Sequence, residues 1–108
     1  MFLIRMKAGD PVGWLRIYGI DREKSEAWLT YFALDRRHWG RGLGTDALKT
    51  VLQTFLKEQE VNSVFLETFP DNERAMGCYL KCGFKVIEKV WRGEGKERVE
   101  MLRMRWQR

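Results

Sequence analysis

Residues 27–56 read AWLTYFALDRRHWGRGLGTDALKTVLQTFL, and the fold is decided here because the hydrophobic period changes within this stretch. The first eight residues, 27–34, are almost all apolar or aromatic, which is typical of a strand covered on both faces. From Leu43 to Leu56 apolar residues recur every three or four positions, which predicts an amphipathic helix. A buried strand therefore leads through a glycine-rich loop into a helix.

The loop between them has glycines at the alternate positions 40, 42 and 44 and arginines at 36, 37 and 41. Backbone N–H groups turned toward one point, at the positive end of a helix dipole, form an anion site. Guanidinium groups add directed bonds to phosphate. The spacing matches neither a Walker loop nor the dinucleotide fingerprint. Taken alone, the loop predicts either a phosphate site or an exposed connector of the same composition.

Turn residues and hydrophobic periodicity predict the remaining elements on both sides of this stretch. Strands are expected at residues 2–6, 12–18, 61–68, 84–92 and 98–106, and a second helix at residues 73–82. Asn72 can cap that helix and Gly83 marks its end. Gly93-Glu94-Gly95 predicts a hairpin turn. This order of strands and helices predicts an α+β or mixed α/β fold in a single domain, residues 1–108.

Composition narrows the class of protein. The 108 residues are 44% hydrophobic and carry a net charge of +5, which fits a globular chain with anionic partners. The charges are interleaved rather than gathered in a basic run, so we expect no nucleic-acid partner. Two cysteines, Cys78 and Cys82, with the single His38 predict no metal site. The apolar start of the chain is too short for a signal peptide or a membrane span, and we expect a cytoplasmic protein with no membrane partner.

The run Asn72-x-x-Ala75-x-x-x-Tyr79-x-x-x-Gly83-Phe84 follows the glycine loop by about thirty residues. Together the two segments resemble the signature motifs of the GNAT superfamily of acetyl-CoA-dependent N-acetyltransferases, and the resemblance covers roughly residues 27–106. It implies a mixed, mostly antiparallel central sheet with a splayed strand pair and flanking helices. It also implies transfer of an acetyl group from acetyl-CoA to a primary amine by direct attack.

The resemblance assigns the cofactor to particular residues. The pyrophosphate would lie on the backbone of Trp39, Gly40, Arg41, Gly42, Leu43, Gly44 and Thr45. The pantetheine arm would run beside Phe32, Ala33 and Leu34, between the strands that end near Leu34 and Thr68, and pair with the first of them as an added strand. Asn72 would contact the cofactor or its bound water.

Two residues are expected to carry the chemistry. Tyr79 matches the family's usual general acid, which protonates the departing thiolate. Glu67 is the candidate base for the ammonium acceptor. It should share a strand face with Phe65; a semi-buried cleft would raise its pKa, whereas solvent would leave it a surface carboxylate. Glu26 is a weaker candidate base. A covalent route through Cys78 is less favoured, because no histidine stands near it in sequence.

Two departures from the family pattern affect the interpretation. Trp39 stands where family members usually carry Gln or Arg, which concerns only cofactor affinity. The chain begins near what resembles the second strand, so the first strand and helices are expected to be largely missing. A homodimer, whose partner covers the exposed sheet face, is favoured.

Two functions other than acetyl transfer stay open. The first is a non-catalytic CoA-binding or regulatory module, and the second, less favoured, is a basic interaction protein. Trp14 or Trp28 could line an acceptor cleft.

Overall fold

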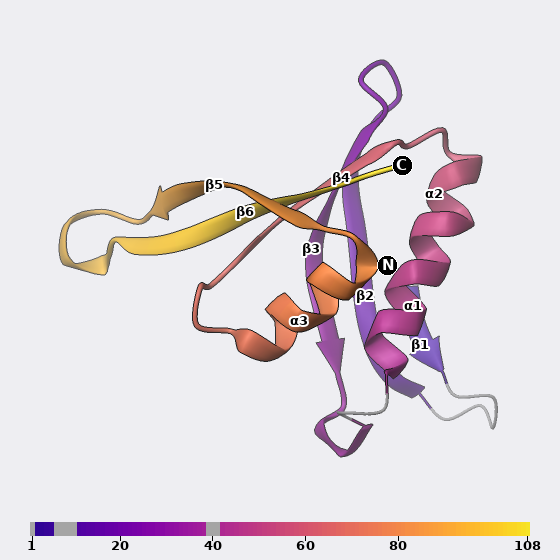
Figure 1. The fold of residues 1–108 in the computed structure, drawn as a ribbon, viewed down its shortest axis with the longest axis horizontal. Coiled ribbons are helices and arrows are strands. Elements are labelled where there is room, and N and C mark those ends of the chain that lie inside the picture. The colour runs from indigo at the N-terminus through magenta and orange to yellow at the C-terminus, as the bar shows by residue number, and fades with distance from the viewer. Residues whose placement is uncertain (1, 6–10, 39–41) are drawn as a thin grey trace.

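The computed structural model describes residues 2–5, 11–38 and 42–108, and these form a six-stranded sheet with three α-helices (Figure 1). The sheet order is β1-β2-β3-β4-β6-β5, and every neighbouring pair is antiparallel except β3 and β4. The predicted mixed, mostly antiparallel sheet is confirmed. The strands are β1 Phe2–Arg5, β2 Pro11–Asp21, β3 Glu26–Leu34, β4 Ser63–Thr68, β5 Lys85–Arg92 and β6 Val99–Gln107. The helices are α1 Leu43–Gln53, α2 Phe55–Glu58 and α3 Glu73–Cys82, with short 3-10 turns η1 Arg36–His38 and η2 Gly95–Glu97.

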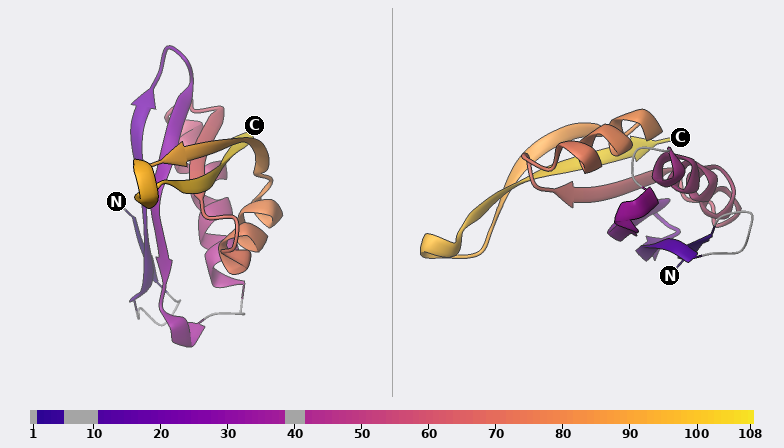
Figure 2. Two further views of the ribbon diagram at one scale, coloured as in Figure 1. Left: turned by 90° about the vertical axis from the view of Figure 1, so that its left-hand side faces the viewer. Right: turned by 90° about the horizontal axis from the view of Figure 1, so that it is seen from below.

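The helices lie on one face of the sheet (Figure 2). That face contains the apolar core, in which alternate strand residues pack against α1 and α3. Its fully buried side chains include Leu15, Leu48, Leu66, Phe84 and Met104. We call this the helix-covered face and the opposite one the open face, since no described helix packs there. The prediction that residues 27–34 are covered on both faces is therefore wrong: the open face of β3 carries half-buried Trp28, whose ring packs on Phe65 of β4 at 5.3 Å.

The two central strands β3 and β4 run parallel but pair over a short stretch only. Their register pairs end at Trp28 opposite Phe65, which leaves the rest of β3 and the end of β4 unpaired with each other. The predicted splayed strand pair is confirmed. A separated strand end exposes one row of backbone N–H and C=O groups, to which an extended ligand can add.

A bulge in β3 lies just beyond this separation. Arg16 of β2 is opposite Tyr31, whereas the next residue, Ile17, is opposite Leu29, so Thr30 is an additional residue in β3. An additional residue reverses the alternation of side chains along a strand. Leu29 and Phe32 thus both belong to the core of the helix-covered face, although they are three positions apart.

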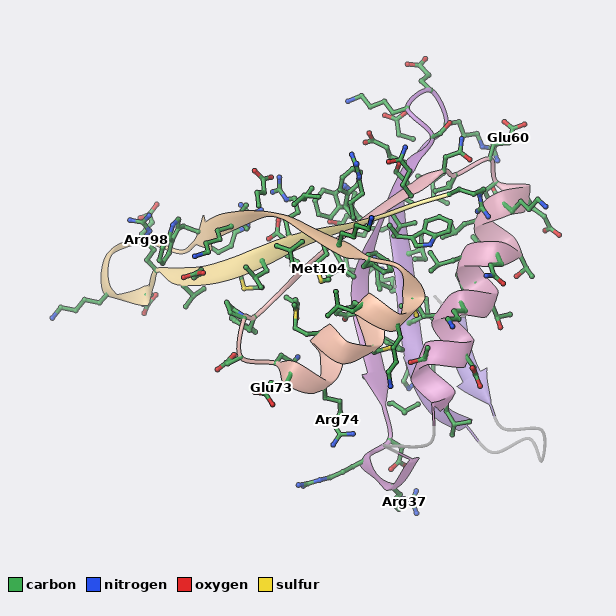
Figure 3. The ribbon with its side chains drawn as sticks, in the orientation of Figure 1. Arg37, Glu60, Glu73, Arg74, Arg98 and Met104 are labelled. Carbon is green, nitrogen blue, oxygen red and sulfur yellow. The ribbon has the colours of Figure 1, made fainter. Side chains whose placement is uncertain are left out.

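The β5–β6 hairpin extends away from the rest of the molecule (Figure 1). Figure 3 shows Arg98 at its outer end, whereas Met104 of the same hairpin lies close to the body and is fully buried. Near the hairpin, several large apolar side chains are exposed to solvent: Phe69, Leu80, Val86, Ile87, Trp91 and Val99.

One local prediction differs from the structure. The helix expected through Leu56 is interrupted at Thr54, whose φ of −111° and ψ of −76° depart from helical values, and α2 begins at the next residue, Phe55. The hairpin predicted at Gly93-Glu94-Gly95 is confirmed: β5 and β6 pair antiparallel, and η2 lies within their connection. Of the described helices, none is both long and apolar enough to cross a membrane.

Candidate active site

A cavity of about 920 Å³ opens on the helix-covered face, where the end of β3 meets the start of α1 and the length of α3. We call it the helix-side cavity. It is lined by Phe32, Ala33, Leu34, Gly42, Leu43, Gly44, Thr45, Asn72, Glu73, Arg74, Ala75, Gly77, Cys78, Tyr79 and Lys81. All eight predicted cofactor residues that the structure describes are among them. The other three, Trp39, Gly40 and Arg41, lie outside the described residues.

The start of α1 gives this cavity its capacity for an anion. Gly42 is the N-cap residue and has a φ of 74°, a left-handed conformation that glycine adopts readily. It has no side chain to accept from the first-turn N–H groups, so these donors are available to a ligand. Gly44 allows close packing, since a Cβ there would lie 3.1 Å from Cζ of Phe32.

The helix α3 carries the other predicted residues of this cavity. Asn72 caps it, as predicted, and its Oδ1 accepts from the Ala75 N–H at 3.4 Å. Tyr79 is buried between the rings of Phe32 and Phe84, at centroid distances of 6.1 and 5.8 Å. Burial, with a smaller contribution from the neighbouring thiols, raises the pKa of Tyr79 to about 12. The phenol is therefore protonated at neutral pH and is able to donate.

Two thiols lie beside Tyr79, one turn apart on α3. The Thr45 hydroxyl donates to Sγ of Cys78 at 3.5 Å, and Sγ of Cys82 lies 3.6 Å from the Thr45 carbonyl oxygen. Hydrogen bonding from Cys82, then from Thr45, together with the charge of Lys81, lowers the pKa of Cys78 to about 6 despite its partial burial. The same pairing raises the pKa of Cys82. Cys78 is thus the more acidic thiol and lines the cavity.

The cations of the helix-side cavity differ from those predicted. Arg74 and Lys81 of α3 line it, whereas Arg36 and Arg37 do not. Arg37 is held by Asp35 through a bond of 2.9 Å between Nη2 and Oδ2 and is exposed, and it points away from the body in Figure 3. The third predicted arginine, Arg41, lies outside the described residues, so the cations that the structure shows at this cavity are those of α3.

A second cavity, of about 460 Å³, lies on the open face of the sheet. We call it the open-face cavity; it is lined by Tyr18, Trp28, Leu29, Thr30, Glu67, Arg92 and Arg103. Glu67 shares its strand face with Phe65, opposite the buried Leu66 and Thr68, as the alternation predicted. Trp28, one of the two tryptophans expected at an acceptor cleft, lines this cavity, whereas neither Trp14 nor Glu26 is among the residues that line either cavity.

Glu67 is the centre of an ionic network in this cavity. Arg92 donates through Nε to Oε1 at 2.9 Å and through Nη2 to Oε2. Arg103 donates to Oε2 through Nη2 at 3.0 Å and through Nε at 3.3 Å, and its Nη1 bonds Glu88. These bonds, chiefly those from Arg92, outweigh burial and lower the pKa of Glu67. The expectation that a semi-buried cleft would raise this pKa is therefore wrong, because the cleft contains two guanidinium groups.

Sequence reasoning missed both arginines. Arg103 is opposite Glu67 in the β4–β6 register and Arg92 lies on β5, so their approach depends on strand pairing across 36 and 25 residues. No local pattern indicates that pairing. The two predicted catalytic residues, Tyr79 and Glu67, line different cavities, and β3 contributes to both. In the part of the chain that the structure describes, no three His, Cys, Asp or Glu side chains gather as metal ligands do.

Three features occur together here: a helix N-terminus with free N–H groups, a splayed strand pair beside it, and a following helix with a buried tyrosine. This combination is typical of proteins that bind a phosphate-bearing cofactor. The model of the acetyltransferase (GNAT) family matches residues 1–84, and the chain belongs to that family.

The chain is also similar to individual acetyltransferases. Spermine/spermidine N(1)-acetyltransferase of Bacillus subtilis is 31% identical over 83 residues, which are 71% of this chain and 54% of that protein. Among solved structures, Ard1 from Thermoplasma volcanium has a TM-score of 0.77 and 29% identity, covering 93% of this chain and 65% of that one. The microcin C7 self-immunity acetyltransferase, solved with acetyl-CoA and AMP, shares the fold with a TM-score of 0.79, at 17% identity over 93% of this chain and 56% of that one. The chain spans about half the length of the curated relative.

Proposed function

We propose that this protein transfers an acetyl group from acetyl-CoA to a primary amine. The observation that carries the proposal is the lining of the helix-side cavity, which includes all eight described residues that the family motifs assign to the cofactor. The pyrophosphate lies at the start of α1, and Arg74 and Lys81 supply the neutralising charge. The pantetheine arm lies along Phe32–Leu34, where β3 has parted from β4 and can accept an added strand.

The acceptor enters from the open-face cavity, and the reaction is direct attack. The amine nitrogen bonds to the thioester carbon, and backbone N–H groups of β3 stabilise the oxyanion. The C–S bond then breaks, and Tyr79 gives its proton to the sulfur. The nitrogen loses its remaining extra proton as the amide forms, and a proton from water restores the Tyr79 phenol. Glu67 assists removal of the proton from the acceptor ammonium. Its lowered pKa makes it a weak base, so the proton passes on to water rather than remaining on the carboxylate.

Replacement of Tyr79 by Phe tests the proposal. The ring still fills its place between Phe32 and Phe84, so CoA affinity by calorimetry and the melting temperature should hardly change. The loss of a general acid should lower kcat by about 10²- to 10⁴-fold in an assay that detects released CoA thiol. An unchanged kcat would show that Tyr79 is not the proton donor.

One observation favours a second function, that of a non-catalytic CoA-binding or regulatory module. Both oxygens of the candidate base are already bound by guanidinium groups. Such a module would bind CoA in calorimetry and release no thiol with any amine, whereas an enzyme releases thiol in proportion to the acceptor added.

We further propose that the protein works in the cytoplasm and as a homodimer. Cys78 and Cys82 are free thiols, as is usual in a reducing compartment. Exposed apolar side chains on the hairpin and the open face, such as Trp91 and Tyr18, offer surface for a second copy. A monomer in analytical ultracentrifugation at micromolar concentration would contradict the dimer.

A further inference from the structure

We infer that the open-face cavity selects an amine that also carries a carboxylate group, and that it disfavours polyamines. The inference rests on the proposed transfer to an amine and names the class of acceptor. It follows from the contacts and charges of the residues lining that cavity.

The first observation concerns the acid in the cavity. Glu67 is the single acidic residue among those that line it. Its side chain is 16% exposed, and its two oxygens accept four N–H bonds from Arg92 and Arg103. Three of these bonds go to Oε2 and one to Oε1, so a second ammonium group on an acceptor would have to share a carboxylate that two guanidinium groups already neutralise.

The second observation concerns the arginines. Arg103 is held on three sides, since it bonds Glu67 and Glu88 and its guanidinium lies 5.5 Å from the centre of the Trp28 ring. Arg92 is bound on one edge only, through Nε and Nη2, and its side chain is 54% exposed. Its Nη1 has no partner among the described residues. Arg92 can thus donate to an incoming carboxylate without releasing Glu67.

The charge of the lining points the same way. The lining holds one glutamate and two arginines, and Glu88, which lies outside the lining, pairs with Arg103, so the guanidinium that keeps an open donor edge is that of Arg92. Like charges raise the free energy of a bound polyamine, while an opposite charge lowers that of a bound carboxylate. The face of Trp28, which could otherwise stabilise an ammonium group, already has Arg103 over it.

The guanidinium groups of the cavity also favour the reactive form of the acceptor amine. Nearby guanidinium groups disfavour the protonated form of an acceptor amine and lower its pKa. The amine therefore reaches the thioester in its neutral, nucleophilic form more readily, which compensates for the weak basicity of Glu67.

Three acceptors of equal chain length test the inference: 4-aminobutyrate, butylamine and 1,4-diaminobutane. They share one primary amine and differ at the far end, which is anionic, neutral or cationic. We expect kcat/KM to fall in that order, by about tenfold from the first to the last, as one charge-assisted bond predicts. Equal values, or a preference for the diamine, would overturn the inference.

The variant Arg92→Gln tests the role of the guanidinium. It removes the donor and frees one edge of Glu67, so the preference for 4-aminobutyrate should disappear and the diamine should gain. Arg98→Gln is the matched control, since Arg98 lies at the outer end of the hairpin over Trp91, at 4.3 Å (Figure 3), and the order of acceptors should stay. An Arg92→Gln protein that keeps the wild-type order would contradict the inference.

A binding measurement separates this inference from the proposed function. If no acceptor releases thiol, the transfer proposal fails, and quenching of tryptophan fluorescence by the same three compounds, with CoA present, decides the inference. Tighter binding of 4-aminobutyrate than of the diamine supports it. Equal binding, the reverse order, or no binding of any of the three overturns it.

Discussion

The helix-covered face and the open face of the sheet place their ionisable side chains in different environments. The covered face buries an apolar core and keeps the phenol of Tyr79 protonated by desolvating it. The open face keeps Glu67 charged by surrounding it with guanidinium groups. A neutral phenol and an ionised carboxylate thus lie on opposite sides of one sheet, and a substitution on one face should leave the chemistry of the other face unchanged.

The largest expected effect is on stability and concerns the covered face. Phe84→Ala removes a fully buried ring, and the lost burial and the remaining cavity should cost about 3–5 kcal/mol of unfolding free energy. Trp14→Ala removes a larger ring from the open face, where 46% of the residue is exposed, and should cost less than about 1 kcal/mol. Urea denaturation followed by circular dichroism measures both.

A milder variant keeps the comparison measurable if Phe84→Ala does not fold. Phe84→Leu retains most of the apolar contacts and should cost about half as much as the alanine variant or less. A loss for Trp14→Ala as large as that for Phe84→Leu would mean that the open face is covered in solution, for instance by a second copy of the chain.

The sequence predicted the covered face far better than the open one. The N-cap at Asn72, the left-handed Gly83 at the end of α3 and the change of period after Leu34 are all local signals, and the structure agrees with them. The family motifs are equally local, so the helix-side cavity could be assigned residue by residue. The network around Glu67 depends on strand registers, which no local pattern indicates. The interruption of the helix at Thr54 falls within a favourable helical period, so periodicity alone could not predict it.

The next effect concerns the ionic network. Glu67→Gln leaves Arg92 and Arg103 without their carboxylate and should lower the unfolding free energy at pH 7 by about 1 kcal/mol, since solvent screens part of the network. The folded-state pKa of Glu67 is below its ordinary value of 4.5. Its stabilisation is therefore present above pH 4.5 and is lost as pH falls below that value and through the folded pKa.

Urea titrations of both proteins at several pH values between 3 and 7 check this dependence. The difference between wild type and Glu67→Gln should shrink toward acid pH. Glu100→Gln is the control, because its partner Lys89 is 72% exposed and the pair is 3.7 Å apart, so little change is expected at any pH. A difference that stays constant across the range would mean that Glu67 stabilises through packing rather than through its charge.

The smallest expected effect is on the alkylation rate of Cys78, which reports which cavity a ligand occupies and does not depend on a change in stability. The pKa of Cys78, lowered to about 6, makes it mostly thiolate at pH 7, so its alkylation by iodoacetamide should gain little rate between pH 7 and pH 8. Cys82→Ala removes the strongest of the hydrogen bonds that lower this pKa, and the rate at pH 7 should then drop severalfold. Since Cys78 lines the helix-side cavity, CoA should protect it, whereas 4-aminobutyrate, directed to the open-face cavity, should not. Protection by the amine alone would mean that both ligands compete for one cavity, and the separation of the two faces would then fail.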